Sequence, residues 1–173
     1  MGRVAVAVVV VVLATTGCGT RDEPVLGVGD EAEVRASIVS GRGQGGTALI
    51  GITPVEVRRG EPADLAGRTY TDDDLATVAT PDGTPHYVDA RLVNKGDEEL
   101  TSGPAAHGVD STGAELEDLN TSGLHPPVVA CGTPALGLSP TAVSGYTTCY
   151  LFVVPPGRRL DRLRVGDAEW KLG

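Results

Sequence analysis

The sequence predicts an all-β protein, an immunoglobulin-like antiparallel β-sandwich with about seven to nine short strands and little helix. Several short segments alternate apolar and polar residues, as strands with one solvated face do. Turn residues separate these segments at short intervals, which is typical of sandwiches. Aromatic residues make up only 3% of the chain, so the core must consist mainly of Val, Leu, Ile and Ala.

The first half of the chain contains three segments with the strand pattern. Residues 30–38 alternate strictly, and residues 47–57 do so until Pro54, which predicts an edge strand or a bulge because proline cannot donate a ladder hydrogen bond. The alternation is clearest at 85–94, and a turn from residue 94 to 97 ends it.

The second half predicts an interior strand and two hairpins. Residues 147–154 are apolar on both faces, as in a strand covered on both sides. One hairpin is expected across residues 110–113 and another around the pair 166–167. Residues 59–85 lack a strand pattern, and we expect a short helical turn near residues 73–74, because acidic residues favour helix N-termini.

Residues 1–17 have the form of a secretory signal, with Arg3 before an apolar run and small residues after it. The run at 4–14 covers about 16 Å as a helix, which is about half of a hydrocarbon core, so it cannot span a bilayer. It ends in Thr15-Thr16-Gly17-Cys18, which resembles the lipobox of bacterial lipoproteins, with Thr15 in place of the usual Leu-like residue.

The lipobox resemblance implies a lipid anchor. In that family the cysteine is alkylated with a diacylglyceryl group and becomes the mature N-terminus, so Cys18 is the predicted lipidation site. Two or three acyl chains form a stable anchor in a membrane. The alternative is an ordinary cleaved signal with an incidental Cys18, in which case the protein is secreted.

The mature chain is expected to contain a flexible tether at 18–29 and one sandwich domain at 30–173. The formal net charge is −9, and it becomes −10 when the single Arg of the signal is removed. Such a surface repels nucleic acid and anionic lipid headgroups, so no nucleic-acid partner is expected and membrane attachment must come from the lipid.

The cysteine count predicts one disulfide. Of three cysteines, Cys18 is assigned to the lipid, and Cys131 and Cys149 remain as a pair in an exported protein. Immunoglobulin domains have a cysteine pair that lies much farther apart in the sequence and flanks a Trp. We therefore expect this disulfide to fix a loop or neighbouring strand to the strand at 147–154. A catalytic thiol would need a free Cys beside a His.

Five short segments occur in an order that resembles a group of actinobacterial secreted lipoproteins with an uncharacterised immunoglobulin-like domain. They are VGDEAEV, GEPADL, PHYVDARLVNKGDEEL, ACG and YTTCYLFVVPPG, and together they cover most of residues 27–165. The resemblance implies a lipid-anchored β-sandwich with no established catalytic activity and no family site to transfer. The chain departs from the group in its lipobox and in the acidic insert Asp72 to Asp74.

Few residues are candidates for catalysis or metal binding. His86, His107 and His125 lack the spacing of a zinc site, and exposed histidines are expected. Asp72, Asp73, Asp74 and Asp82 offer carboxylates for calcium, but the EF-hand spacing is absent and a solvated loop is favoured. No metal or other cofactor is therefore expected.

Other short motifs point to no specific chemistry. The Gly-rich stretch 41–46 precedes a strand rather than a helix, so it does not predict nucleotide binding. No G-x-S-x-G of the serine hydrolases occurs, and Asn120-Thr121-Ser122 matches a glycosylation acceptor only formally.

The sequence favours a non-enzymatic binding module at the cell envelope. Two long loops, 59–85 and 120–145, could contact an envelope protein partner. One alternative is an extracytoplasmic hydrolase or metal-dependent enzyme whose site is assembled only in the fold. A further alternative is a structural envelope protein without a specific ligand.

Overall fold

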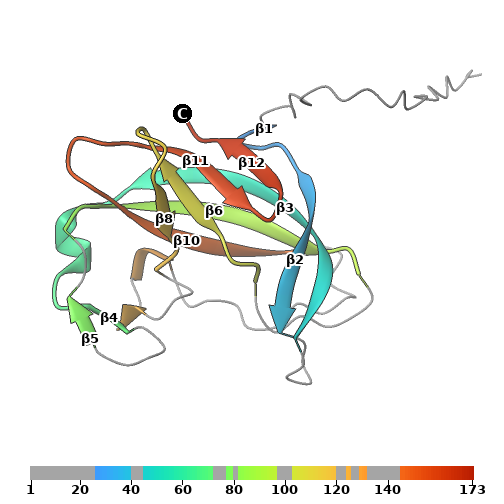
Figure 1. Cartoon of the computed structure of the whole chain (residues 1–173), viewed down its shortest axis with the longest axis horizontal. Coiled ribbons are helices and arrows are strands. Elements are labelled where there is room, and N and C mark those ends of the chain that lie inside the picture. Colours follow the sequence, from blue (N-terminus) through green and yellow to red (C-terminus); the bar gives the residue numbers. More distant parts are fainter. Residues whose placement is uncertain are drawn as a thin grey trace, which may run out of the picture.

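The computed structural model describes residues 26–39, 45–71, 77–79, 82–96, 103–119, 124–125, 129–131 and 145–173. These residues form two packed sheets, so the predicted antiparallel β-sandwich is confirmed (Figure 1). The elements are β1 Leu26–Gly27, β2 Ala32–Val39, β3 Gly45–Arg59, η1 Pro62–Leu65, β4 Thr69–Thr71, β5 Thr77–Ala79, β6 Thr84–Asn94, β7 His107–Asp110, β8 Glu115–Glu117, β9 Leu124–His125, η2 Val129–Cys131, β10 Tyr146–Val154, β11 Leu160–Val165 and β12 Ala168–Lys171; η1 and η2 are 3-10 helices.

The strand order, which the sequence left open, combines segments that are distant along the chain. Sheet A has the order β1-β12-β11-β7-β8, and sheet B has the order β10-β6-β3-β2. A small third sheet has the order β5-β4-β9. Along the chain, β2 and β3 lie in sheet B, and β6 follows in the same sheet after β4 and β5 of the third sheet. The β7–β8 hairpin lies in sheet A, β10 returns to sheet B after β9, and the β11–β12 hairpin lies in sheet A.

The core lies between the two sheets and is formed by alternate residues of facing strands. Phe152, Trp170 and Leu163 are fully buried there. Gly108 leaves room for this packing, because a Cβ at that position would lie 2.9 Å from the Phe152 ring. The core consists of Val34, Ile50, Ile52, Val88, Ala90, Leu92, Ala106, Tyr150, Phe152, Val154, Leu160, Leu163, Val165 and Trp170.

Strand β10 is buried on both faces, as its sequence predicts. Its even-numbered residues from Tyr150 to Val154 face the core, and Cys149, Leu151 and Val153 belong to a second apolar cluster on the other face of sheet B. That cluster also contains Leu65, Tyr87 and Leu119. Burial on both faces is what makes β10 apolar throughout.

The expectation that β10 is an interior strand is wrong, because it is the last strand of sheet B. The chain that follows β8 covers its outer edge instead. Leu119 N donates to Leu151 O at 2.8 Å, and Leu151 N donates to the Asp118 carboxylate at 2.8 Å. The Asp118 side chain thus takes the place of a neighbouring strand's carbonyl.

The N-terminal residues of the described chain belong to the sandwich and not to the tether. Leu26 and Gly27 pair in parallel with Trp170 and Lys171 of β12. The next turn is fixed by Gly29 N, which donates to Pro54 O at 2.7 Å. Residues 26–29, which were expected to belong to a tether, are therefore part of the sandwich.

Three local predictions are confirmed. The register between β3 and β6 shifts between Pro54 and Glu56, which is the bulge that the proline predicts. The β7–β8 hairpin turns across residues 110–114, and Gly113 there has a positive φ of 86°. The β11–β12 hairpin turns at 166–167, between the paired strand ends at 165 and 168.

The expectation for residues 59–85 is wrong in part. The helical turn lies at η1, where Pro62 starts it and Asp64 accepts a hydrogen bond from Glu61 N. Strands β4 and β5 occur where no strand was expected, and Thr77–Ala79 is extended rather than helical. The predicted start of the turn near residues 73–74 lies outside the described residues.

Asp110 organises the end of the sandwich where two turns meet. Its carboxylate accepts hydrogen bonds from Thr112 N at 2.8 Å, Thr112 Oγ1 at 2.7 Å and Ala114 N at 3.1 Å. Arg158 donates to the other oxygen at 2.8 Å, and Asp110 is only 1% exposed. Arg158 and these donors hold the pKa of Asp110 well below its usual range.

We therefore predict that Asp110→Asn lowers the free energy of unfolding at neutral pH and that the difference from the wild type depends on pH. A lowered pKa in the folded state stabilises the protein above the pKa of the unfolded state, which is about 3.9. The difference should shrink as the pH falls below that value. Urea denaturation between neutral pH and acid measures it, and a constant difference would contradict the prediction.

Candidate functional site

Described parts of the two loops proposed as binding surfaces lie next to each other in the structure. β4, from the first loop, pairs with β5 and also with β9 from the second loop, where Thr69 is opposite His125. η1 packs against β6, and η2 packs against β6 and β10. We call η1, β4, β5, β9 and η2 the cap. Figure 1 shows β4 and β5 at the lower left, away from β1 and the C-terminus at the top.

A disulfide joins the cap to the sandwich, as the cysteine count predicts. Cys131 of η2 is bonded to Cys149 of β10, with their Cα atoms 5.2 Å apart. Cys149 is 5% exposed and belongs to the second apolar cluster, whereas Cys131 is partly exposed at its margin. The bond therefore ties an exposed turn to a strand that is part of the core.

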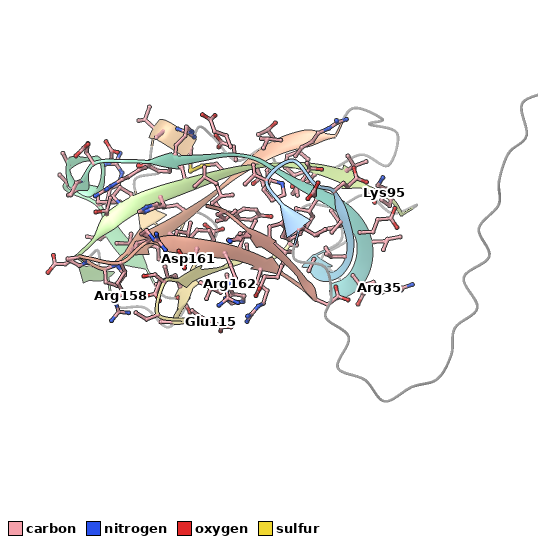
Figure 2. The ribbon with its side chains drawn as sticks, turned by 90° about the horizontal axis from the view of Figure 1, so that it is seen from above. Arg35, Lys95, Glu115, Arg158, Asp161 and Arg162 are labelled. Carbon is pink, nitrogen blue, oxygen red and sulfur yellow. A yellow bond between two sulfur atoms is a disulfide. The ribbon has the colours of Figure 1, made fainter. Side chains whose placement is uncertain are left out.

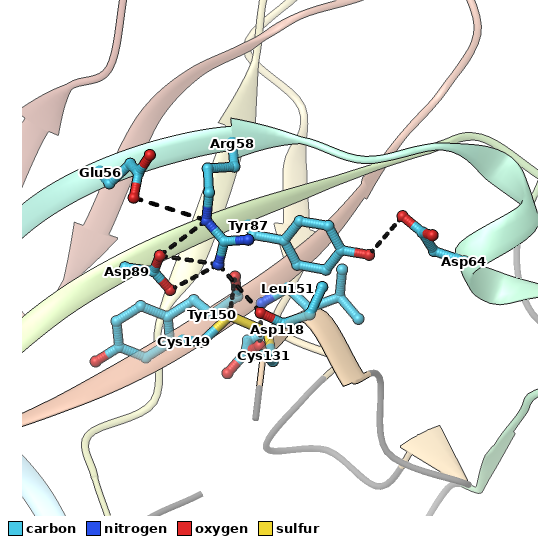
Figure 3. The surroundings of a disulfide bond; sticks show 11 residues. Glu56, Arg58, Asp64, Tyr87, Asp89, Asp118, Cys131, Cys149, Tyr150 and Leu151 are labelled. Atoms are coloured by element: carbon cyan, nitrogen blue, oxygen red, sulfur yellow. Dashed lines mark hydrogen bonds and ion pairs between the residues drawn. A yellow bond between two sulfur atoms is a disulfide. The ribbon is translucent and has the colours of Figure 1, made fainter. Parts of the chain in front are cut away.

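Arg58 provides a second connection at the same place (Figure 3). Its guanidinium donates two hydrogen bonds to Asp89, at 2.9 and 3.1 Å, and a third to Ala130 O in η2 at 3.2 Å. The group also lies over the Tyr87 ring, 5.3 Å from its centroid. A planar guanidinium can make all these contacts at once, which a lysine cannot.

Tyr87 and Asp64 hold η1 against the sheet. The Tyr87 hydroxyl donates to the Asp64 carboxylate at 3.1 Å, and the same oxygen accepts from Glu61 N at 3.0 Å. Burial, together with the negative charge of Asp64, raises the pKa of Tyr87 to about 12. Gly60 is needed here, because a Cβ would lie 2.6 Å from both the Tyr87 ring and Asp64.

The two histidines whose side chains are described lie in different sheets. His86 lies in β6 of sheet B, and His107 lies exposed in β7 of sheet A. The expectation of exposed histidines is wrong for His86, which is half-buried on the sheet with Nδ1 3.1 Å from Thr84 O, and burial lowers its pKa. His125 pairs in β9, where only its backbone is described.

The candidate calcium ligands lie mostly outside the described residues. Asp82 is described and exposed, whereas Asp72, Asp73 and Asp74 are not described. The described ranges contain no group of three or more His, Cys, Asp or Glu residues that could hold a metal ion. Cys18 and Asn120 also lie outside those ranges.

The outer face of sheet A carries many charges, but its arginines have acidic partners. Arg162 pairs with Glu169 at 2.9 Å, and Arg164 pairs with both Glu169 and Glu115. Figure 2 shows Arg158, Asp161, Arg162 and Glu115 gathered on this side of the molecule. These ion pairs are typical of a solvated sheet face and form no concentrated positive patch.

The cap contacts were not predicted from the sequence. Strand alternation places Asp89 on the outer face of β6. The bulge after Pro54 then shifts the register of β3, so that Glu56 pairs with Asp89 and Arg58 pairs with Tyr87. Only this shift brings Arg58 within reach of Asp89. The contact with Ala130 depends on a residue distant in the sequence. Only the disulfide indicated which segments would meet.

In comparisons with protein-family models, curated proteins and solved structures, no significant match was found for this chain. The resemblance to actinobacterial lipoproteins therefore stays a prediction. Among the residues that the structure describes, no helix is long and apolar enough to cross a bilayer.

The disulfide should contribute substantially to stability. Replacing both cysteines (Cys131→Ala with Cys149→Ala) should lower the free energy of unfolding by about 3 kcal/mol, the chain-entropy estimate for a loop of this length. Urea denaturation of the double variant and of the oxidised wild type measures this difference. Equal stability of the two proteins would contradict the prediction.

Arg58→Lys should lower stability by about 1 kcal/mol, because the bidentate pair with Asp89 and the bond to Ala130 O cannot both be kept. Arg59→Lys, at the exposed neighbouring position, is the matched control and should have little effect. Hydrogen exchange should also quicken in η2 for the Arg58 variant only. If the two variants behave alike, the assigned role of Arg58 is wrong.

Proposed function

We propose that this protein is a lipid-anchored extracytoplasmic binding module, without catalytic activity, whose cap contacts a protein of the cell envelope. The observation that carries the proposal is the joining of two distant loops into one cap that is attached to a rigid sandwich. Binding residues are commonly placed on loops that a scaffold holds in position.

Two features support a location outside the cytoplasm. The N-terminal residues have the order of a signal, and Cys18 stands where a lipoprotein would be acylated. The remaining cysteines, Cys131 and Cys149, are paired in a disulfide, which persists in oxidising compartments.

The roles of the polar groups in and near the cap favour binding over catalysis. Asp64 accepts from Tyr87 and Glu61, and Asp89 accepts from Arg58, so these carboxylates hold cap and sheet together. By contrast, Val129 is 87% exposed on η2, at the point where the disulfide fixes the turn. An exposed apolar side chain next to a disulfide is suited to contact with a partner.

The anchor can be tested by its chemical mass. The wild type should partition with the membrane and carry acyl chains on residue 18 after removal of residues 1–17, whereas Cys18→Ser should lose both the added mass and the membrane association. Mass spectrometry and fractionation measure these outcomes. An unchanged membrane fraction in the variant would argue against the anchor.

The cap can be tested by two matched charge substitutions. In a pull-down from envelope extract with the mature domain, Val129→Asp should abolish capture of any specific partner. Val28→Asp should leave it intact, because Val28 is exposed and directly follows β1, which lies away from the cap. Loss of capture with both variants, or with neither, would contradict the placement of the binding surface on the cap.

A further inference from the structure

The end of the sandwich where the described chain begins carries two exposed valines, Val28 and Val55, and a short stretch of chain separates it from Cys18. We infer that this end lies against the lipid surface, and that the cap points away from it. The inference rests on the lipid anchor proposed above. We call Leu26, Val28, Val55 and Leu172 the tether end.

The number of residues in the tether limits how far this end can lie from the bilayer. Seven residues separate Cys18 from Leu26. Even a fully extended chain of that length spans at most about 28 Å, and a flexible one averages about 16 Å. A strand as long as β6, with 11 residues, already measures about 36 Å. The tether therefore keeps Leu26 close to the membrane and leaves the remote cap farther away.

Hydrogen bonding brings the apolar residues of the tether end together. Gly29 N donates to Pro54 O. Val28 precedes Gly29 and Val55 follows Pro54, so this bond holds the two valines near each other. Val28 is 41% exposed and Val55 is 48% exposed. Among the residues whose side-chain exposure the structure describes, Val129 on the cap is the one other exposed large apolar residue. Leu26 and Leu172 are partly buried beside them against the core.

The charges near this end favour contact only when the protein is anchored. Glu31 pairs with Lys95 at 2.8 Å, whereas the Asp30 carboxylate accepts from the neutral Gly27 N. Glu56, next to Val55, lies 3.9 Å from Arg58, so this end carries negative charge. Lys171 is the exposed cation next to Gly27 in the β1–β12 pair. With a mature charge near −10, the unanchored domain should not bind vesicles, and the contact then depends on the tether.

The orientation can be measured with a fluorophore at either end. The mature protein is coupled through Cys18 to a lipid that carries a cyanobenzothiazole group, which condenses selectively with an N-terminal cysteine, on phosphatidylcholine/phosphatidylglycerol vesicles. A single engineered thiol, Val28→Cys or Val55→Cys, is then labelled. Val129→Cys is the matched control, because it places the same fluorophore at an exposed valine on the cap.

Spin-labelled lipids should quench the fluorophore at positions 28 and 55 several-fold more strongly than at position 129. Equal quenching at all three positions, stronger quenching at 129, or no quenching at any of them would overturn the inference. Because the lipid is attached chemically, the result is independent of whether the cell acylates Cys18, which the mass of the native protein tests separately.

Discussion

Strand β10 is the element on which the rest of the structure depends. One face supplies Tyr150, Phe152 and Val154 to the core between the sheets, and the other supplies Cys149, Leu151 and Val153 to the cluster beneath the cap. It also carries one half of the disulfide. Because residues 149–154 of β10 contribute alternately to both clusters, the position of the cap is linked directly to the folding of the sandwich.

An edge strand with such an apolar sequence is exposed to pairing with other chains, and the fold prevents this. Residues 118–119 cover β10, with Asp118 accepting from Leu151 N. On the other side of the sandwich, β1 pairs with β12, and Trp170 Nε1 donates to Asp30 O at 3.0 Å, joining the start of β2 to sheet A. Both edges are thus covered by short segments, residues 118–119 and β1, that lie where the chain leaves one sheet.

Much of the architecture could be predicted because period-two alternation and turn residues act locally. The strands at 30–38 and 85–94 and both hairpins followed from such signals, the bulge followed from Pro54, and the disulfide followed from the cysteine count. The small sheet of the cap did not, because strands of two or three residues are too short for an alternation to be recognised, and they form only when paired. The closure by Asp118 and the contacts of Arg58 depend on register and on distant residues.

The account can be tested most directly through the backbone amide of Leu151. If β10 is covered on both faces and its edge is satisfied by Asp118, this amide should exchange with solvent only when the whole protein unfolds. Native-state hydrogen exchange at increasing urea concentrations measures its opening free energy, which should equal the free energy of global unfolding. Local fraying would instead give an opening free energy that is far below that value and does not change with urea concentration. That result would contradict the central role assigned to β10.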